Sequence, residues 1–147
     1  MPTFMKHLGE VWRCANLYRA EQFEALEIGS YQDSYIIEIC KQPGIAQEKL
    51  AGLIYVHKSN VARQLNSLEE KGFVIRESDP NDKRNLLVYP TDKARAALPA
   101  IRQVHRRWNE LVLGGLSEEE QEAVARYMEI LSENAKRVIA RQGEGKE

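Results

Sequence analysis

The fold of this chain is decided by residues 58–71, whose sequence is KSNVARQLNSLEEK. Val61, Leu65 and Leu68 recur at intervals of four and three residues, which places them on one side of a helix. Residues 46–53 form another helical pattern, and only a few residues separate the two. Two helices joined by so tight a corner predict a helix-turn-helix, in which residues 58–71 are the second helix.

The residues after this helix predict a β-hairpin. Gly72 suits the left-handed conformation that often ends a helix, and β-forming residues follow it. Turn-forming residues gather at 79–82, and a second β-rich run occupies 86–89. We therefore expect a hairpin over residues 73–89, in which Ser78 to Leu86 forms a wing beside the helix-turn-helix.

On the N-terminal side, apolar residues at helical spacing predict one long amphipathic helix that ends near Gly29. A short and mostly apolar helix is expected after Ser34, and it stops at Pro43-Gly44. Its apolar composition predicts that it is buried.

On the C-terminal side, Thr91 can cap a helix in which we expect a kink at Pro99. Gly114-Gly115 ends that helix, and the sequence SEEE at residues 117–120 forms a capping box for the last one. The last helix carries apolar residues in alternating steps of four and three, which is the spacing of a seam pressed against another helix.

The expected fold class is mainly α with a small β-hairpin wing. We divide the chain into an N-terminal helix that contributes to dimerisation, a winged helix-turn-helix region, C-terminal dimerisation helices and a disordered tail without apolar anchors, at residues 1–30, 31–90, 91–141 and 142–147. The apolar stripes of the first and last helices are too extensive to stay exposed on so small a chain, so we expect an obligate homodimer.

Composition excludes several classes of protein. With 147 residues the chain is too short for a large multi-domain enzyme, and no apolar run approaches a membrane span. The start of the sequence has no secretory signal, so we expect a cytoplasmic protein. Two cysteines are too few for a disulfide framework and are not spaced as a zinc site, and we expect no metal or cofactor. The net charge of −1 is unusual for a nucleic-acid binder, but a local basic face is sufficient.

The side of residues 58–71 opposite the apolar stripe is polar and not acidic. Arginine can bridge the acceptors of guanine, and asparagine or glutamine can pair with adenine. We therefore expect the second helix to enter the major groove of double-stranded DNA. Its candidate contacts are Lys58, Ser59, Asn60, Arg63, Gln64 and Ser67. At the hairpin tip Lys83 and Arg84 can enter the minor groove, with the Asp82 carboxylate orienting the arginine.

As an ordered set, these motifs resemble the MarR family of bacterial regulators. The resemblance runs from Pro43 to Glu120 and is carried by PGIAQEKLA (43–51), KSNVARQL (58–65), LEEKGFV (68–74), the pattern RxxDPNDKR (76–84) and PTDK (90–93). It implies a dimer of winged helices on a pseudo-palindromic operator, with recognition helices in successive major grooves and Arg84 in the flanking minor groove. It also implies a transcription regulator, and we expect a repressor that a small molecule releases.

The sequence departs from the family pattern in four places. His57 replaces a frequent acidic helix cap, Asn60 and Ala62 replace two frequent threonines of the recognition helix, and Pro90 precedes Thr91 after the wing. These departures affect the operator sequence and not the fold.

The resemblance also suggests a small aromatic or phenolic effector. The family packs certain segments between its dimerisation and DNA-binding parts, and in this chain those segments carry Trp12, Tyr18, Tyr31, Tyr35, His105 and Trp108. For any single one of these residues, a structural place in the core is favoured over a role in ligand binding. Cys14 and Tyr18 are one helical turn apart, as in the peroxide sensors of the family, so a thiol-based sensor stays as an alternative to an inert thiol.

Two other classes of function are open to the chain. An enzyme is disfavoured because there is no phosphate loop, metal-spaced cluster or nucleophile motif, and the three histidines are scattered. A winged helix that binds another protein should carry apolar anchors on its exposed helix, where this sequence has polar side chains.

Overall fold

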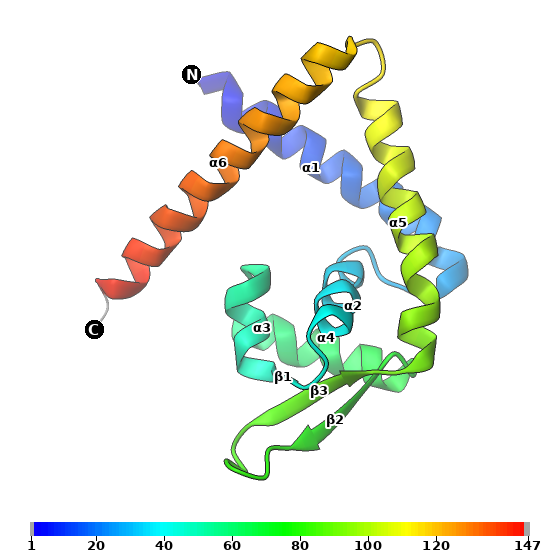
Figure 1. The fold of residues 1–147 in the computed structure, drawn as a ribbon, viewed down its shortest axis with the longest axis vertical. Coiled ribbons are helices and arrows are strands. Elements are labelled where there is room, and N and C mark those ends of the chain that lie inside the picture. The colour runs from blue at the N-terminus through cyan, green and yellow to red at the C-terminus, as the bar shows by residue number, and fades with distance from the viewer. Residues whose placement is uncertain (1, 146–147) are drawn as a thin grey trace. The chain divides into compact units, whose positions relative to one another are not determined.

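The computed structural model describes residues 2–145 of the chain. Figure 1 shows the elements, which are α1 (Pro2–Phe23), the 3-10 turn η1 (Glu24–Leu26), α2 (Gln32–Lys41), β1 (Ile45–Ala46), α3 (Gln47–Ile54), α4 (Lys58–Glu70), β2 (Val74–Ser78), β3 (Leu86–Pro90), α5 (Asp92–Val112) and α6 (Glu118–Glu144). The expected fold class, mainly helical with a small hairpin, is confirmed. The chain divides after Trp108 into two compact units. No helix in the described part has the length and apolar character needed to span a membrane.

The first helix is shorter than expected. It ends at Phe23 and not near Gly29, because the chain tightens into η1 and Glu27 takes a left-handed conformation with φ 61°. The Ile28 amide then donates to the Phe23 carbonyl at 3.3 Å. This reversal places Phe23 and Ile28 in the core, where both are buried. A continuous helix would have carried Ile28 past the core.

The second helix is buried as predicted, but α2 begins at Gln32, two residues before Ser34. The Gln32 side chain accepts a hydrogen bond from the Gly29 amide at 2.9 Å and so stabilises the start of the helix. Tyr35, Ile36 and Ile39 point into the core and are at most 1% exposed.

The helix-turn-helix is confirmed as α3 and α4. Tyr55 makes the corner between them in a left-handed conformation with φ 61°. Val61, Leu65 and Leu68 are all buried, as their spacing predicted. Their burial against the rest of the core fixes which sides of α4 remain available at the surface.

The hairpin is also confirmed, but it belongs to a sheet of three strands in the order β1-β3-β2. The strand β1, in which Ile45 pairs with Val88 in antiparallel register, was not predicted from the sequence. The Gly44 amide donates to the Val88 carbonyl at 2.8 Å next to this pair. A strand of two residues is too short to show a periodic pattern, so only the tertiary pairing reveals it.

The C-terminal helices begin where their caps predicted. The Thr91 hydroxyl accepts from the Ala94 amide at 3.4 Å, and α5 runs on through Pro99 without ending there. The capping box of α6 is complete, since the Glu120 amide donates to Ser117 Oγ at 3.2 Å and the Ser117 amide donates to Glu120 Oε2 at 2.8 Å. The helix continues to Glu144, so residues 142–144 are helical where we expected a disordered tail; residues 146–147 lie outside the described part.

Candidate nucleic-acid interface

The candidate DNA-binding residues of α4 lie on two different sides of the helix. Lys58, Ser59 and Arg63 are exposed, as expected for a reading face. Asn60, Gln64 and Ser67 are only partly exposed, and all three side chains bond to α2. The expectation that these three side chains face away from the protein was therefore wrong. At 100° per residue they share one flank of the helix, and the packing of α2 covers that flank.

Two residues of α2 make the bonds to α4. The Tyr35 hydroxyl donates to Asn60 Oδ1 at 2.8 Å. Gln32 Nε2 donates to Gln64 Oε1 at 3.1 Å and to Ser67 Oγ at 3.0 Å. Burial raises the pKa of the Tyr35 hydroxyl, against a smaller opposing effect of the Arg63 charge, so Tyr35 keeps its proton at neutral pH.

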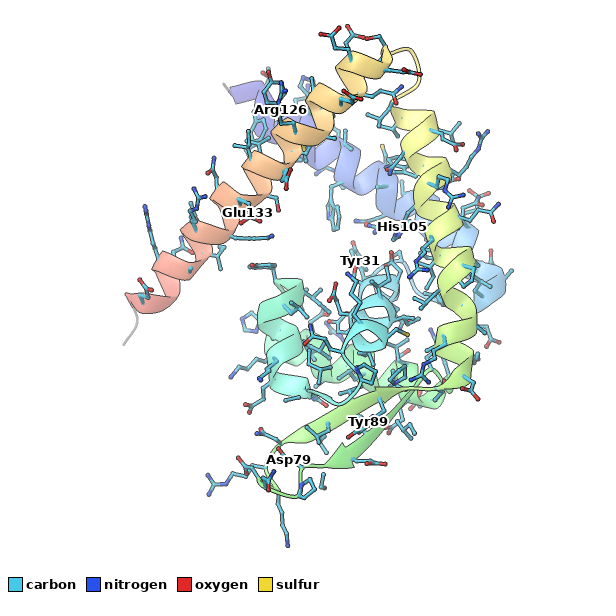
Figure 2. The ribbon with its side chains drawn as sticks, viewed as in Figure 1. Tyr31, Asp79, Tyr89, His105, Arg126 and Glu133 are labelled. Carbon is cyan, nitrogen blue, oxygen red and sulfur yellow. The ribbon has the colours of Figure 1, made fainter. Side chains whose placement is uncertain are left out.

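The wing tip is ordered by side chains that cap its own backbone. Asp79, labelled at the tip of the hairpin in Figure 2, accepts from the Asn81 amide at 2.9 Å. Asp82 Oδ1 accepts from the backbone amide of Arg84 at 3.1 Å. We expected the Asp82 carboxylate to orient the Arg84 guanidinium; the bond observed instead fixes the backbone from which that side chain projects. Lys83 and Arg84 are both exposed.

Arg76 on β2 links the hairpin to the recognition helix, a role that was not predicted from the sequence. Its guanidinium donates to Glu69 Oε2 at 3.1 Å, to Asn66 Oδ1 at 2.7 Å and to Gln47 Oε1 at 3.3 Å. The hydrogen bond from Arg76 is the largest effect that holds the pKa of the Glu69 carboxyl below its ordinary value. An arginine in the first strand of the wing, seven residues after a glutamate near the end of the helix, was the available sequence signal.

Four of the six candidate effector residues form two aromatic pairs, whereas Tyr35 and His105 lie outside both pairs. Trp12 and Tyr31 lie 6.5 Å apart between ring centroids, and Tyr18 and Trp108 lie 5.3 Å apart. Tyr18 also lines a groove between α1 and α5 of about 330 Å³. Tyr35 belongs to neither group, because it is 1% exposed and its hydroxyl bonds to α4.

A polar cluster of α1, α2 and α5 lies beside these aromatics. Asp33, which is fully buried, accepts from Arg19 at 3.4 Å and lies 2.7 Å from His105 Nε2 through the same oxygen, Oδ2. Arg19 also bonds to Asn16 and stacks over the Trp12 ring at 5.1 Å. His105 and Tyr31 are labelled in Figure 2. The buried Asp33 carboxylate thus links α2 to Arg19 on α1 and to His105 on α5.

The two thiols differ in environment. Cys14 is exposed on α1, whereas Cys40 is half-buried, and burial raises the pKa of the Cys40 thiol. A raised pKa reduces the thiolate fraction at neutral pH and so reduces reactivity. Among the described residues, no cluster of three or more His, Cys, Asp or Glu side chains is placed to hold a metal ion.

Both the sequence and the fold match known proteins. The MarR family model matches residues 32–86. YybA, an uncharacterized HTH-type transcriptional regulator of Bacillus subtilis (strain 168), is 28% identical over 93% of this chain and 91% of its own. The transcriptional regulator HosA of Escherichia coli O111:H- is 35% identical over 69% of this chain and 75% of its own. A Listeria monocytogenes protein, classed as a MarR family transcriptional regulator and solved in complex with 26mer DNA, is 26% identical with a TM-score of 0.81 over 90% of this chain and 89% of that one.

Proposed function

Because the chain belongs to the MarR family of transcription regulators, we propose that it acts in the cytoplasm as a homodimer that binds a pseudo-palindromic operator in double-stranded DNA. We further propose that it is a repressor, which a small molecule releases from the operator. The family is one of transcription regulators and not of enzymes. The observation that carries the proposal is the pairing of an exposed polar face on α4 with an ordered cationic wing.

In the proposed complex, α4 lies in the major groove. Lys58, Ser59 and Arg63 are the exposed side chains at its N-terminal end, which is the part of a recognition helix that contacts base edges. Asn60 and Gln64 contribute from the flank of the helix, where one end of each amide is already bonded to α2. Ser67 lies one turn further along α4, where it can reach only the DNA backbone.

The proposed wing contact is in the minor groove. Arg84 and Lys83 project from a turn that Asp82 and Asp79 hold in place, so the backbone that carries the two cations needs little ordering on binding. A narrow A·T-rich minor groove has an enhanced negative potential that attracts such a side chain.

A second copy of the chain is proposed to cover α6. No described residue of α6 is buried, although the helix carries large apolar side chains that are a third to a half exposed. They are Val124, Tyr127, Met128, Ile130, Leu131, Val138 and Ile139. Monomeric proteins rarely leave so much contiguous apolar surface in water. Two-fold symmetry would then set the two recognition helices about 34 Å apart, one turn of DNA.

The proposed effector is a small aromatic or phenolic molecule near α1, α2 and α5. Trp12, Tyr31, Tyr18 and Trp108 supply aromatic surface there, and His105 supplies a polar edge. The exposure of Cys14 supports keeping peroxide sensing as the alternative. In that case an organic hydroperoxide should release DNA from the wild type and not from Cys14→Ser, and a thiol reductant should restore binding.

Selection of bound sequences from random duplex DNA tests the proposed function. We expect an inverted repeat whose halves are about one helical turn apart, and an affinity that falls steeply with salt because phosphate contacts release counterions. Arg63→Ala should relax the preference at one position in each half-site. Equal binding to all duplexes, or an affinity that does not change with salt, would argue against a sequence-specific regulator. Absence of binding to any duplex would favour a winged helix that binds protein.

A further inference from the structure

Gln32 is a nearly buried amide whose orientation the structure determines completely. It is 4% exposed, and its Oε1 accepts from the Gly29 backbone amide and from Lys71 Nζ, both at 2.9 Å. A backbone amide and an ammonium group can only donate hydrogen bonds. The oxygen of Gln32 must therefore point to these two groups, and its Nε2 must point the other way, toward α4.

This orientation is passed on to the recognition helix. Gln32 Nε2 donates to Gln64 Oε1 at 3.1 Å, so the oxygen end of the Gln64 amide is turned toward the protein. The end that remains available to DNA is Nε2, which only donates. A glutamine pairs with adenine by accepting from N6 and donating to N7, and that pairing requires both ends of its amide. The Gln64 oxygen keeps a second lone pair, but the bond to Gln32 turns this oxygen toward α2, so pairing with adenine competes with the bond that orients the amide.

Tyr35, one turn along α2, acts on Asn60 in the same way. Its hydroxyl donates to Asn60 Oδ1 at 2.8 Å, which leaves Asn60 Nδ2 as the free end. Two amides of the recognition helix thus have the same polarity, and both receive it from α2. Such donors meet acceptors at guanine O6 and N7, thymine O4 and adenine N7 in the major groove. Adenine gives them the poorest edge of the three, because its N7 acceptor lies beside the N6 donor, whereas guanine offers two adjacent acceptors.

We propose that Gln32 and Tyr35 are specificity-determining positioning residues, which orient Gln64 and Asn60 so that the recognition helix reads guanine or thymine acceptors in place of adenine. Neither Gln32 nor Tyr35 touches DNA in this arrangement. The inference rests on the proposed function, in that α4 must lie in the major groove.

Gln32→Glu is the most direct test, because it keeps the shape of the side chain and replaces the donating amide nitrogen with an accepting oxygen. The carboxylate accepts at both oxygens, so Gln64 must turn over, donate its Nε2 to Glu and present Oε1 to the DNA. Lys71 Nζ is already within hydrogen-bond distance of Gln32 and offsets the new charge. At the operator position read by Gln64 we expect the preference to move from guanine or thymine toward adenine or cytosine by about tenfold. The readouts are selection from random duplex DNA and titration of the selected operators at fixed salt.

Gln64→Ala identifies the operator position that Gln64 reads, since the base preference of the protein should disappear at that position. The double variant Gln32→Glu with Gln64→Ala should select the same sequences as Gln64→Ala alone, because Gln32 acts through Gln64.

Tyr35→Phe is a second and milder variant that frees Asn60 to accept, and it should raise the affinity for adenine at the Asn60 position. Tyr89→Phe, the same chemical change in a half-buried side chain of β3, is the matched control and should select wild-type sequences.

The outcomes separate the two proposals. If Gln64→Ala and Arg63→Ala leave every operator position unchanged, α4 does not read DNA and the proposed function fails together with this inference. If Gln64→Ala relaxes one position while folded Gln32→Glu and Tyr35→Phe keep the wild-type preferences, α4 reads DNA but α2 does not set its polarity. A shift at the Gln64 position that also persists in the double variant would equally overturn the inference.

Discussion

Replacing Arg76 by alanine should loosen the wing from the recognition helix and destabilise the protein. The Arg76 guanidinium connects β2 to Glu69 and Asn66 on α4 and to Gln47 on α3. Its side chain is only 15% exposed, and it binds both oxygens of Glu69, at 3.1 and 3.3 Å. One substitution therefore removes every one of these links.

The magnitude follows from the exposure of the partners. The Glu69 side chain is 40% exposed, so solvent screens its ion pair, and such pairs contribute about 0.2–1 kcal/mol. Each hydrogen bond to a neutral amide oxygen adds about 0.5–1.5 kcal/mol. We expect Arg76→Ala to lower the free energy of unfolding by about 1–4 kcal/mol.

Urea unfolding at fixed protein concentration measures this change, and a double-mutant cycle with Glu69→Gln isolates the pair. Arg95→Ala is the matched control, since its side chain is 52% exposed and lies 3.9 Å from Asp92, so we expect a loss below about 0.5 kcal/mol. An Arg76→Ala variant with the unfolding midpoint of Arg95→Ala would refute the reasoning. So would strict additivity of Arg76→Ala and Glu69→Gln.

The coupling between Arg76 and Glu69 should depend on pH in a defined direction. The native pKa of Glu69 lies below its ordinary value of 4.5, chiefly because Arg76 donates to the carboxylate. A lowered native pKa stabilises the folded state above the unfolded pKa, and the contribution is lost as the pH falls through the native pKa. The coupling energy should therefore be complete at neutral pH and should shrink below pH 4.5.

Three further predictions concern other parts of the chain. Leu131→Glu, on the exposed apolar side of α6, should shift a dimer toward monomer or aggregate in sedimentation, and a folded wild-type monomer at micromolar concentration would contradict the proposed dimer. Arg84→Ala should weaken binding most on operators with A·T-rich flanks, and unchanged binding to every operator would show that the wing does not read DNA. Asp33→Ala should cost about 3–5 kcal/mol in urea unfolding, because it leaves the mostly buried Arg19 without its carboxylate, whereas Asp33→Asn should cost less.

The sequence by itself was sufficient for the elements whose signal is local. The spacing of Val61, Leu65 and Leu68 reports which side of α4 is buried, since burial of an apolar stripe requires helical periodicity. The cap at Ser117 is equally local, because a capping box joins residues three apart. The turn residues at 79–82 predicted the wing for the same reason.

Only the tertiary structure decided what lies against each polar surface. The helical periodicity distinguishes the buried apolar stripe of α4 from its polar sides. It does not show that α2 covers the flank that carries Asn60 and Gln64. The bonds of Gln32 to α4 span more than thirty residues of sequence, and those of Arg76 span up to 29, so no local pattern carries them. Sequence thus determined which polar side chains α4 carries. The packing of α2 decided how two of them are oriented, because a hydrogen bond made inside the protein fixes which end of an amide is directed outward.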